Sequence, residues 1–180
     1  MIITIIIIVV VALWVMSSYN SMVSLRNKVE EGFSTMDVYL KKRFDLIPNL
    51  VATVKGYAAH EAETLEKVIG MRSNATTMEQ KVDAERQISD AVKSLMVQVE
   101  AYPDLKANQN FLNLQEQLNG IEEDIANARR YYNGCVRQFN TMLQQFPGNI
   151  VANLFHFQAA SLYQVDESAE RKNVKVDFGK

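Results

Sequence analysis

The stretch FLNLQEQLNGIEEDIANARRYYNGCVRQFNTMLQQF, residues 111–146, decides the fold that we expect. Apolar, aromatic or small side chains recur in it at alternating steps of three and four residues: Phe111, Leu114, Leu118, Ile121, Ile125, Ala128, Tyr132, Cys135, Phe139, Met142 and Phe146. This repeat of 3.5 residues places the whole set on one face of a helix that packs as in a left-handed coiled coil. The pattern predicts a helix of about 40 residues, roughly 60 Å long, that ends at Pro147–Gly148.

Downstream of this helix, less regular structure is expected. Asn149 can cap a short amphipathic segment over residues 150–155. From Gln164 onward the chain is polar, and we expect it to be irregular. We therefore place the helical bundle at residues 21–157 and a mostly irregular tail at residues 158–180.

Upstream, a helix is expected to start near Met78, where Thr76 and Glu79 form a capping-box pattern. Its end is marked by Tyr102-Pro103-Asp104, and its apolar face consists of Val82, Ile88, Val92, Leu95 and Val99.

A longer apolar stripe begins at Met22 and runs at helical spacing to Ala58, then weakens before Leu65 and Ile69. It predicts one long first helix, followed by a turn over residues 70–77, which are rich in Gly, Ser, Asn and Thr. Pro48 interrupts this stripe and should either kink the helix or restart it with Asp45 as the N-cap. Because the stripe keeps its phase across Pro48, we favour the kink.

The first sixteen residues, MIITIIIIVVVALWVM, contain no charged side chain, and the uncharged stretch continues to Arg26. Sixteen residues make about 24 Å of helix, and adding Ser17–Asn20 brings it to the ~30 Å of a bilayer core. Residues 1–20 are therefore predicted to be a transmembrane anchor. Its apolar residues are Ile2, Ile3, Ile5, Ile6, Ile7, Ile8, Val9, Val10, Val11, Leu13, Trp14 and Val15.

Two alternatives compete with an anchor. A cleaved signal peptide would have a basic start and a small-residue cleavage site, and this stretch has neither. The second alternative is a buried core helix, but the run of Ile and Val from Ile5 to Val11 suits lipid better than the core of a bundle.

The stripe from Met22 follows the anchor without Pro or Gly, so we expect the span and the first bundle helix to form one continuous rod. Arg26, Lys28 and the basic residues at 41–43 follow the span, which predicts a single-pass inner-membrane protein with its N-terminus outside and its bundle in the cytoplasm.

The composition supports an all-α fold: an N-terminal transmembrane helix that continues into an elongated, antiparallel, up-down bundle of long helices. The 180 residues include only 7 Gly and 3 Pro, and residues that favour helix are abundant. The formal net charge of −2 argues against a nucleic-acid partner.

The sequence shows no recognisable catalytic motif. His60-Glu61 lacks the second histidine of a zinc-protease helix, since position 64 is Thr, and neither His60 nor His156 follows a Glu at the spacing of a di-iron site. Cys135 lies on the heptad face and is expected to be a buried small hydrophobe. We expect no enzyme activity, cofactor, metal or small-molecule substrate. The many Asn, Gln and Tyr residues of 110–140 are interpreted as a solvated face with interhelical hydrogen bonds or, alternatively, as a surface for partners or self-association.

Several longer motifs resemble the bacterial LemA family. They are Tyr19-Asn20, Leu25-Arg26-Asn27, Asp37-Val38, the stretches 40–43 and 45–51, Val54–Tyr57, His60-Glu61, 102–108 with Phe111, Ile125-Ala126, Ala128-Arg129-Arg130, Tyr132-Asn133, Phe139-Asn140 and Phe146-Pro147. The resemblance extends from about Tyr19 to Phe178. It departs at His156, where relatives usually have Gly between two aromatics, and in the tail 158–170, which lacks the prolines common there.

The resemblance implies an N-terminal transmembrane helix and a cytoplasmic antiparallel helical domain, without an established activity. Candidate interaction residues from its motifs are Arg43, Asp45, Pro48, Asn49, Tyr57, His60, Glu61, Tyr102, Pro103, Arg129, Arg130, Tyr132 and Asn133. The leading hypothesis is a membrane-anchored scaffold whose partners are the lipid bilayer, further copies of itself and an unidentified protein. The alternatives are an accessory subunit or enzyme that uses the polar cluster around Pro48 and His60-Glu61, and a periplasmic or secreted domain after cleavage.

Overall fold

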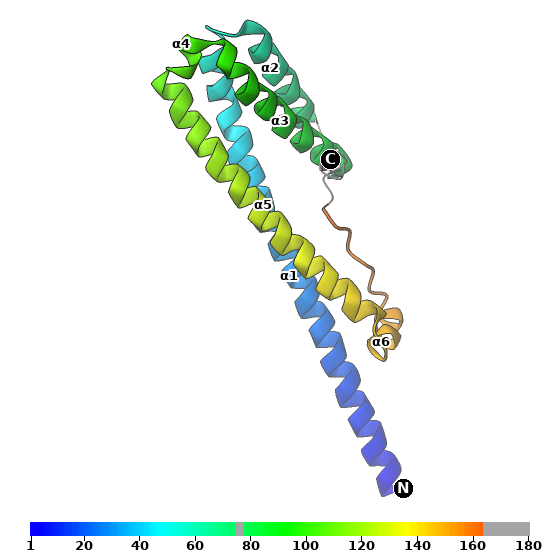
Figure 1. The fold of residues 1–180 in the computed structure, drawn as a ribbon. Coiled ribbons are helices and arrows are strands. Elements are labelled where there is room, and N and C mark those ends of the chain that lie inside the picture. The colour runs from blue at the N-terminus through cyan, green and yellow to red at the C-terminus, as the bar shows by residue number, and fades with distance from the viewer. Residues whose placement is uncertain (75–77, 164–180) are drawn as a thin grey trace, which may run out of the picture.

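The computed structural model describes residues 1–74 and 78–163, which form helices and their connections without any strand. Figure 1 shows an elongated molecule in which two long helices run side by side. In chain order the elements are α1 Ile2–Val54, α2 Ala59–Asn74, α3 Met78–Gln98, the 3-10 turn η1 Val99–Ala101, α4 Pro103–Lys106, α5 Gln109–Gln144 and α6 Gly148–Leu154. The all-α prediction is therefore confirmed.

Helix α5 packs antiparallel against α1 along the seam that its heptad pattern predicts. Cys135 and Phe139 meet Val29, Ile125 and Ala128 meet Met36 and Leu40, and Phe111–Leu118 meet Ile47–Val54. The heptad residues from Phe111 to Phe139 are buried, apart from the half-buried Ile121 and Tyr132. Phe146 is an exception, because α5 ends at Gln144 and leaves this ring 81% exposed.

The first helix of the bundle is shorter than its apolar stripe predicts. Helix α1 ends at Val54, the chain turns at residues 55–58, and α2 starts at Ala59, so the expectation of one helix reaching Ile69 is wrong. The stripe concealed the turn because Val54, Ala58 and Ala62 keep helical spacing and are all buried. Figure 1 shows α2 and α3 as a helical hairpin beside the upper halves of α1 and α5.

Pro48 lies within α1, and the helix continues through it. The alternative in which Asp45 caps a restarted helix is wrong, since the Asp45 carboxylate instead pairs with Lys41 at 3.3 Å, one turn earlier. Pro48 is exposed, so the residue 44 carbonyl that loses its helical donor lies near solvent. The capping box at Thr76–Glu79 and the side chain of Val82 lie outside the described residues.

The first turns of α1 extend beyond the bundle, and they are continuous with it, as the sequence predicts (Figure 1). Helix α1 is long and apolar enough to cross a membrane, judged by length and composition. Only 6% of its most apolar 18-residue stretch is buried. Among the twelve predicted anchor residues only Val15 is partly covered; the others are exposed. This is the pattern of a single-pass anchor that enters lipid.

Two short segments complete the fold beyond α5. Helix α6 begins at Gly148 with Pro147 at the cap position, so the expected Asn149 cap and start at residue 150 are wrong by two residues, and no side-chain cap is present. Residues 157–163 then form neither helix nor strand. They run back along the bundle as the orange trace in Figure 1, and we call them the strap.

Candidate functional site

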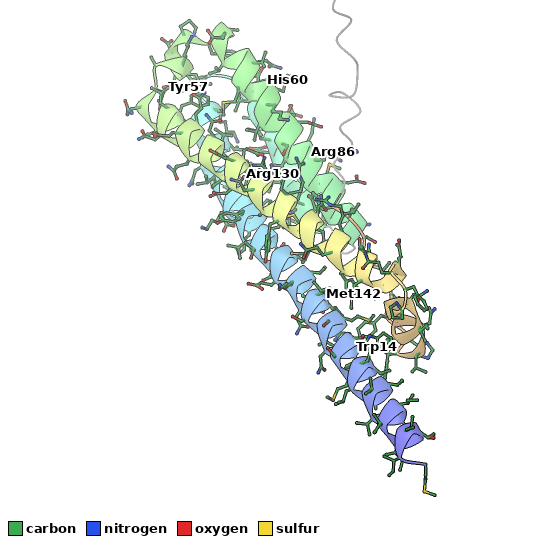
Figure 2. All side chains as sticks on the ribbon, turned by 60° about the horizontal axis from the view of Figure 1, so that its bottom comes forward. Trp14, Tyr57, His60, Arg86, Arg130 and Met142 are labelled. Carbon is green, nitrogen blue, oxygen red and sulfur yellow. The ribbon has the colours of Figure 1, made fainter. Side chains whose placement is uncertain are left out.

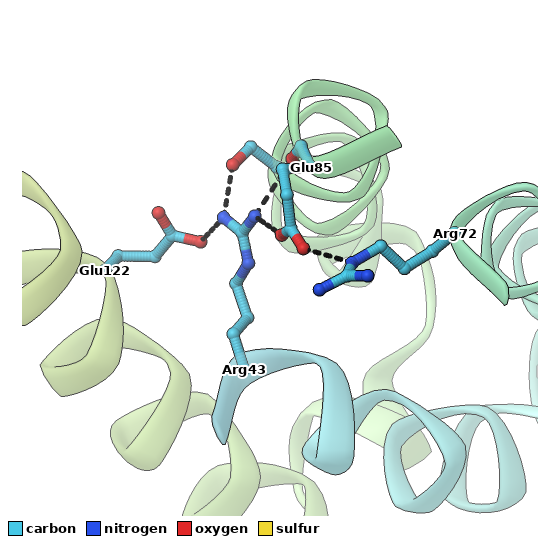
Figure 3. Close-up of polar contacts among 5 residues, drawn as sticks. Arg43, Arg72, Glu85 and Glu122 are labelled. Carbon is cyan, nitrogen blue, oxygen red and sulfur yellow. Dashed lines mark hydrogen bonds and ion pairs between the residues drawn. The ribbon is translucent and has the colours of Figure 1, made fainter. Parts of the chain in front are cut away.

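A buried cluster of charged residues surrounds Arg43, a side chain of α1 that is only 1% exposed. Its guanidinium donates from Nη1 to Ser89 Oγ at 2.5 Å and to Glu122 Oε1 at 2.6 Å. From Nη2 it donates to Glu85 Oε2 at 2.6 Å and to the Glu85 carbonyl at 2.9 Å. Figure 3 shows how this one side chain joins α1, α3 and α5.

Glu85 is shared between two arginines. Its second oxygen accepts from Arg72 Nε at 2.5 Å, and the Arg72 guanidinium lies over the Phe44 ring at 5.5 Å from the centroid. Helix α2 is thereby connected to the same cluster, so four helices meet at Glu85 and Arg43 (Figure 3).

The charge balance of the cluster keeps Arg43 ionised. Burial lowers the pKa of Arg43, but the charges and hydrogen bonds of Glu122 and Glu85 raise it above its ordinary value. Arg43 Nε is buried without a hydrogen-bond partner, so one of its five donors is unsatisfied.

A cavity of about 220 Å³ borders the cluster and is also lined by Arg86, Arg129 and Tyr163. Burial, with a further contribution from Glu85, raises the pKa of the Tyr163 phenol.

Four further motif candidates lie at the opposite end of the rod from Trp14, where Figure 2 labels Tyr57 and His60. Tyr57 Oη accepts from Asn108 Nδ2 at 3.2 Å, and Tyr102 Oη donates to Glu61 at 3.3 Å. A cavity of about 240 Å³ beside His60 and Glu61 is lined by residues of α2 and α3. These side chains connect the α1–α2 turn to the start of α5.

The polar residues around Pro48 do not join this cavity. Asp45, Pro48 and Asn49 are exposed on α1; Asp45 pairs with Lys41, and the carbonyl of Asn49 accepts from Thr53. Pro103 is the exposed first residue of α4, where its missing N–H costs no helical hydrogen bond. Arg130 is also exposed and donates to Asn127.

Two asparagines of α5 hold the strap by its backbone. Asn140 donates to the Ala160 carbonyl and accepts from the Ala160 amide, both at 2.9 Å. Asn133 repeats this pattern with Tyr163, at 3.1 Å and 2.9 Å. Tyr132 Oη adds a hydrogen bond to the Ser161 carbonyl at 2.8 Å. Part of the polar face of α5 therefore binds the chain's own tail.

Sequence reasoning missed the partners of Arg43. Glu85 and Ser89 lie on the apolar face of α3 with Ile88 and Val92, and a charged residue on such a face is a signal for a buried pair. Glu122 adjoins Ile121 on the heptad face of α5, and Arg72 falls in a stretch with turn composition. Within residues 1–74 and 78–163, no three His, Cys, Asp or Glu side chains gather as a metal-binding group would.

Comparison with known proteins identifies the family. A model described as the LemA family matches residues 32–178, which include Arg43, both of its glutamate partners and the strap. The chain belongs to the LemA family.

Curated relatives match most of the chain. Protein LemA of Metamycoplasma hominis is 28% identical over 165 residues, covering 86% of this chain and 75% of that protein. Magnetosome proteins MamQ 1 and MamQ 2 of Paramagnetospirillum magneticum are each 22% identical over a 175-residue alignment that covers 81% of this chain. The match spans 64% of the length of each MamQ protein.

Within this LemA family chain, the family match starts at Gly32, inside α1. The family region thus begins at a point where α1 lies close to α5: a Cβ on Gly32 would lie 3.2 Å from the Tyr132 Cα. The candidate span of α1 precedes this region, and the buried cluster and the strap lie within it.

Proposed function

We propose that this LemA family protein is a membrane-anchored helical scaffold, which self-associates or recruits protein partners at the cell membrane and has no catalytic activity of its own. The observation that carries the proposal is the division of α1. Its first turns expose apolar side chains to the surroundings, while the same helix, without a break, forms the core of the bundle from Met22 to Val54. Such a helix holds a rigid bundle at a fixed height above a bilayer.

The exposed polar face of α5 supports a role in binding proteins. Tyr131 is 51% exposed, and Asn110, Asn113, Asn119 and Gln117 are exposed along the same helix. Tyr and Arg are enriched in protein interfaces, and a rod offers such a face over its whole length. The basic residues that follow the span favour an inner-membrane protein with the bundle in the cytoplasm and the N-terminus outside.

The alternative of an enzyme or accessory subunit built around Pro48 requires the polar residues to converge. The cavity at His60 and Glu61 is lined without Asp45 or Asn49, which argues for the scaffold instead.

The test is purification of the tagged full-length chain from membranes in a mild detergent, with sizing of the complex by light scattering. Photo-crosslinking from position 131 in intact membranes gives an independent reading, with the buried position 136 as the matched control. Oligomers or a stoichiometric protein partner crosslinked from 131 and not from 136 are expected. A monomer without any crosslinked protein would contradict the proposal.

A further inference from the structure

Helix α6 lies beside the last turns of the candidate membrane span. Val151 and Ala152 of α6 pack with Met22, and Val15 of α1 joins the same apolar cluster. The Tyr19 ring contacts Phe155 and Phe157, with centroids 4.8 Å and 5.6 Å apart. Since Val15 to Met22 spans about 10 Å of helix, α6 is within that distance of the end of the span.

The outer face of α6 is apolar and uncovered. Ile150 and Leu154 lie about one turn apart on α6 and are 55% and 64% exposed, and Phe146, in the turn before the helix, is 81% exposed. Phe155 adds a ring that is 46% exposed. A contiguous apolar face of this kind on a soluble surface normally marks an interaction site.

The charge pattern around this face matches a membrane interface. Between Arg137 and Asp166 the sequence contains no Asp, Glu, Lys or Arg. Trp14 and Tyr19 lie on the adjacent turns of α1, and amphipathic rings prefer the interfacial layer of a bilayer. The first charged residue of α1, Arg26, lies over the Phe157 ring at 5.8 Å and lines a cavity of about 330 Å³ with Tyr19 and His156.

We propose that α6 is a second lipid contact, in which Phe146, Ile150, Leu154 and Phe155 enter the interfacial layer of the same bilayer that α1 crosses. The inference rests on the proposed anchoring by α1. A bilayer is favoured over a second copy of the chain because α6 packs beside the end of the exposed span and the segment around it lacks the charged residues that rim a protein interface. The anchored end of the bundle then has two membrane contacts, which limits its rotation and tilt.

Tryptophan fluorescence of the full-length chain in vesicles tests this contact. Trp14 is the only tryptophan, so Trp14→Phe combined with Leu154→Trp reports on α6 alone. The matched control combines Trp14→Phe with Val97→Trp, because Val97 is 77% exposed on α3, in the bundle. Vesicles are made of phosphatidylcholine with bromine atoms either near the headgroup or near the chain end.

The tryptophan of Leu154→Trp is expected to be quenched at least about threefold more strongly than the tryptophan of Val97→Trp. Bromine near the headgroup should quench it more than bromine near the chain end. Equal emission and quenching of the two would overturn the proposal. Blue-shifted emission without quenching by either lipid would also overturn it and would indicate that a second copy covers α6. An Ile150→Trp variant repeats the measurement if Leu154→Trp does not fold.

The unaltered chain separates this proposal from the anchoring on which it rests. Quenching of Trp14 by bromine shows that α1 enters the bilayer. If Trp14 is quenched and the Leu154→Trp tryptophan is not, only the α6 contact fails; if Trp14 is not quenched, the anchor fails.

Discussion

Arg43, on α1, connects α3 to the packed pair of α1 and α5. Burying a guanidinium costs several kcal/mol, and the cost is recovered only when its hydrogen bonds are made with good geometry. Arg43 makes four, to partners on α3 and α5. A lysine could not replace it, because a single ammonium cannot donate to both sides as the planar guanidinium does. We infer that the cluster sets how the α2–α3 hairpin sits against α1 and α5.

Replacing Arg43 by Met should therefore destabilise the bundle by about 3–5 kcal/mol, because Glu85 loses a buried partner. In a chain of this size that lowers the midpoint of thermal unfolding by roughly 10 °C, measured by circular dichroism in detergent. Lys41→Ala is the matched control, since its pair with Asp45 is 72% and 57% exposed, and it should cost at most about 1 kcal/mol. Adding Glu85→Met to Arg43→Met should recover part of the loss. Equal effects of Arg43→Met and Lys41→Ala would refute the role of the cluster.

His156 adopts a left-handed backbone conformation with φ of 56°, which side chains with a Cβ rarely adopt. A non-glycine residue there costs roughly 1–2 kcal/mol, although His tolerates the conformation better than most. His156→Gly should hold or raise stability by up to about 1 kcal/mol, while His156→Ala should lower it. Comparing the two variants by thermal unfolding separates the backbone from the lost imidazole. The opposite order, with Ala more stable than Gly, would contradict this account.

Sequence reasoning named some residues of the site but not the contacts they make. The resemblance pointed to Arg43, Tyr132 and Asn133 as interaction candidates, and in the structure all three make contacts within the chain. Their partners were not predicted, because a hydrogen bond between an asparagine and a distant backbone leaves no periodic pattern in the sequence. Glu85 could have been found as a charge on an apolar helix face, whereas Ala160 could not.

Among the elements, the α1–α5 pair was the most predictable, because an apolar seam repeated over five heptads is a stronger signal than the helix preferences of single residues. The α1–α2 turn was not predicted, since tertiary burial of Val54, Ala58 and Ala62 maintains the same stripe on both sides of a chain reversal. The boundaries of α6 differ by one or two residues because Pro147 starts the helix without any side-chain cap.

The close packing of α1 against α5 at Tyr132 depends on Gly32. An added Cβ would lie 3.2 Å from the Tyr132 Cα and 3.4 Å from the Tyr131 ring, so the two helices would have to move apart. Gly32→Ala should lower stability by about 1–3 kcal/mol through overpacking. Gly134→Ala, on α5 with open space at its Cβ, should raise stability by roughly 0.5–1 kcal/mol through helix propensity. Chemical unfolding of both variants gives the comparison, and a stabilising Gly32→Ala would show that the helices are not held this closely.

The strap and α5 have matching repeats. Asn133 and Asn140 are about 10.5 Å apart along the helix, and three residues of extended chain from Ala160 to Tyr163 cover about 10 Å. Each asparagine can therefore pair with the backbone in the same way. These hydrogen bonds involve only backbone groups of the strap. The position of the strap therefore depends on the α5 side chains rather than on the strap's own sequence.

Asn140→Asp should release the strap without unfolding the helices. The new carboxylate still accepts from the Ala160 amide but repels the Ala160 carbonyl, a loss of about 1–3 kcal/mol. Hydrogen exchange over residues 157–163 should accelerate, while exchange in α5 stays unchanged. Asn127→Asp is the control, because Asn127 Oδ1 only accepts from Arg130 and Asp can do the same. Unchanged exchange in the strap would contradict the pairing.

At the scale of the whole molecule, α1 is one helix of about 80 Å that forms both the candidate anchor and part of the bundle core. Roughly the first 30 Å suits lipid, and the rest packs against α5. Ser18 and Met22, on the turns that join the two parts, are buried against neighbouring segments of the bundle. Tilting the anchor relative to the bundle would expose them, so packing around the junction opposes bending there.

Continuity of the rod predicts slow hydrogen exchange of amides 17–24 in the vesicle-bound chain, comparable with residues 29–36 of the same helix, and resistance to protease. Ser24→Pro should abolish both, because proline removes the hydrogen bond from residue 24 to the Asn20 carbonyl and its ring clashes with that carbonyl, at a cost of about 3 kcal/mol. Ser24→Ala, at the same exposed position, should leave the exchange and cleavage pattern unaltered. Fast exchange or cleavage at 17–24 in the unaltered chain would mean that the anchor is a flexible tether, and a scaffold of fixed height above the membrane would then be excluded.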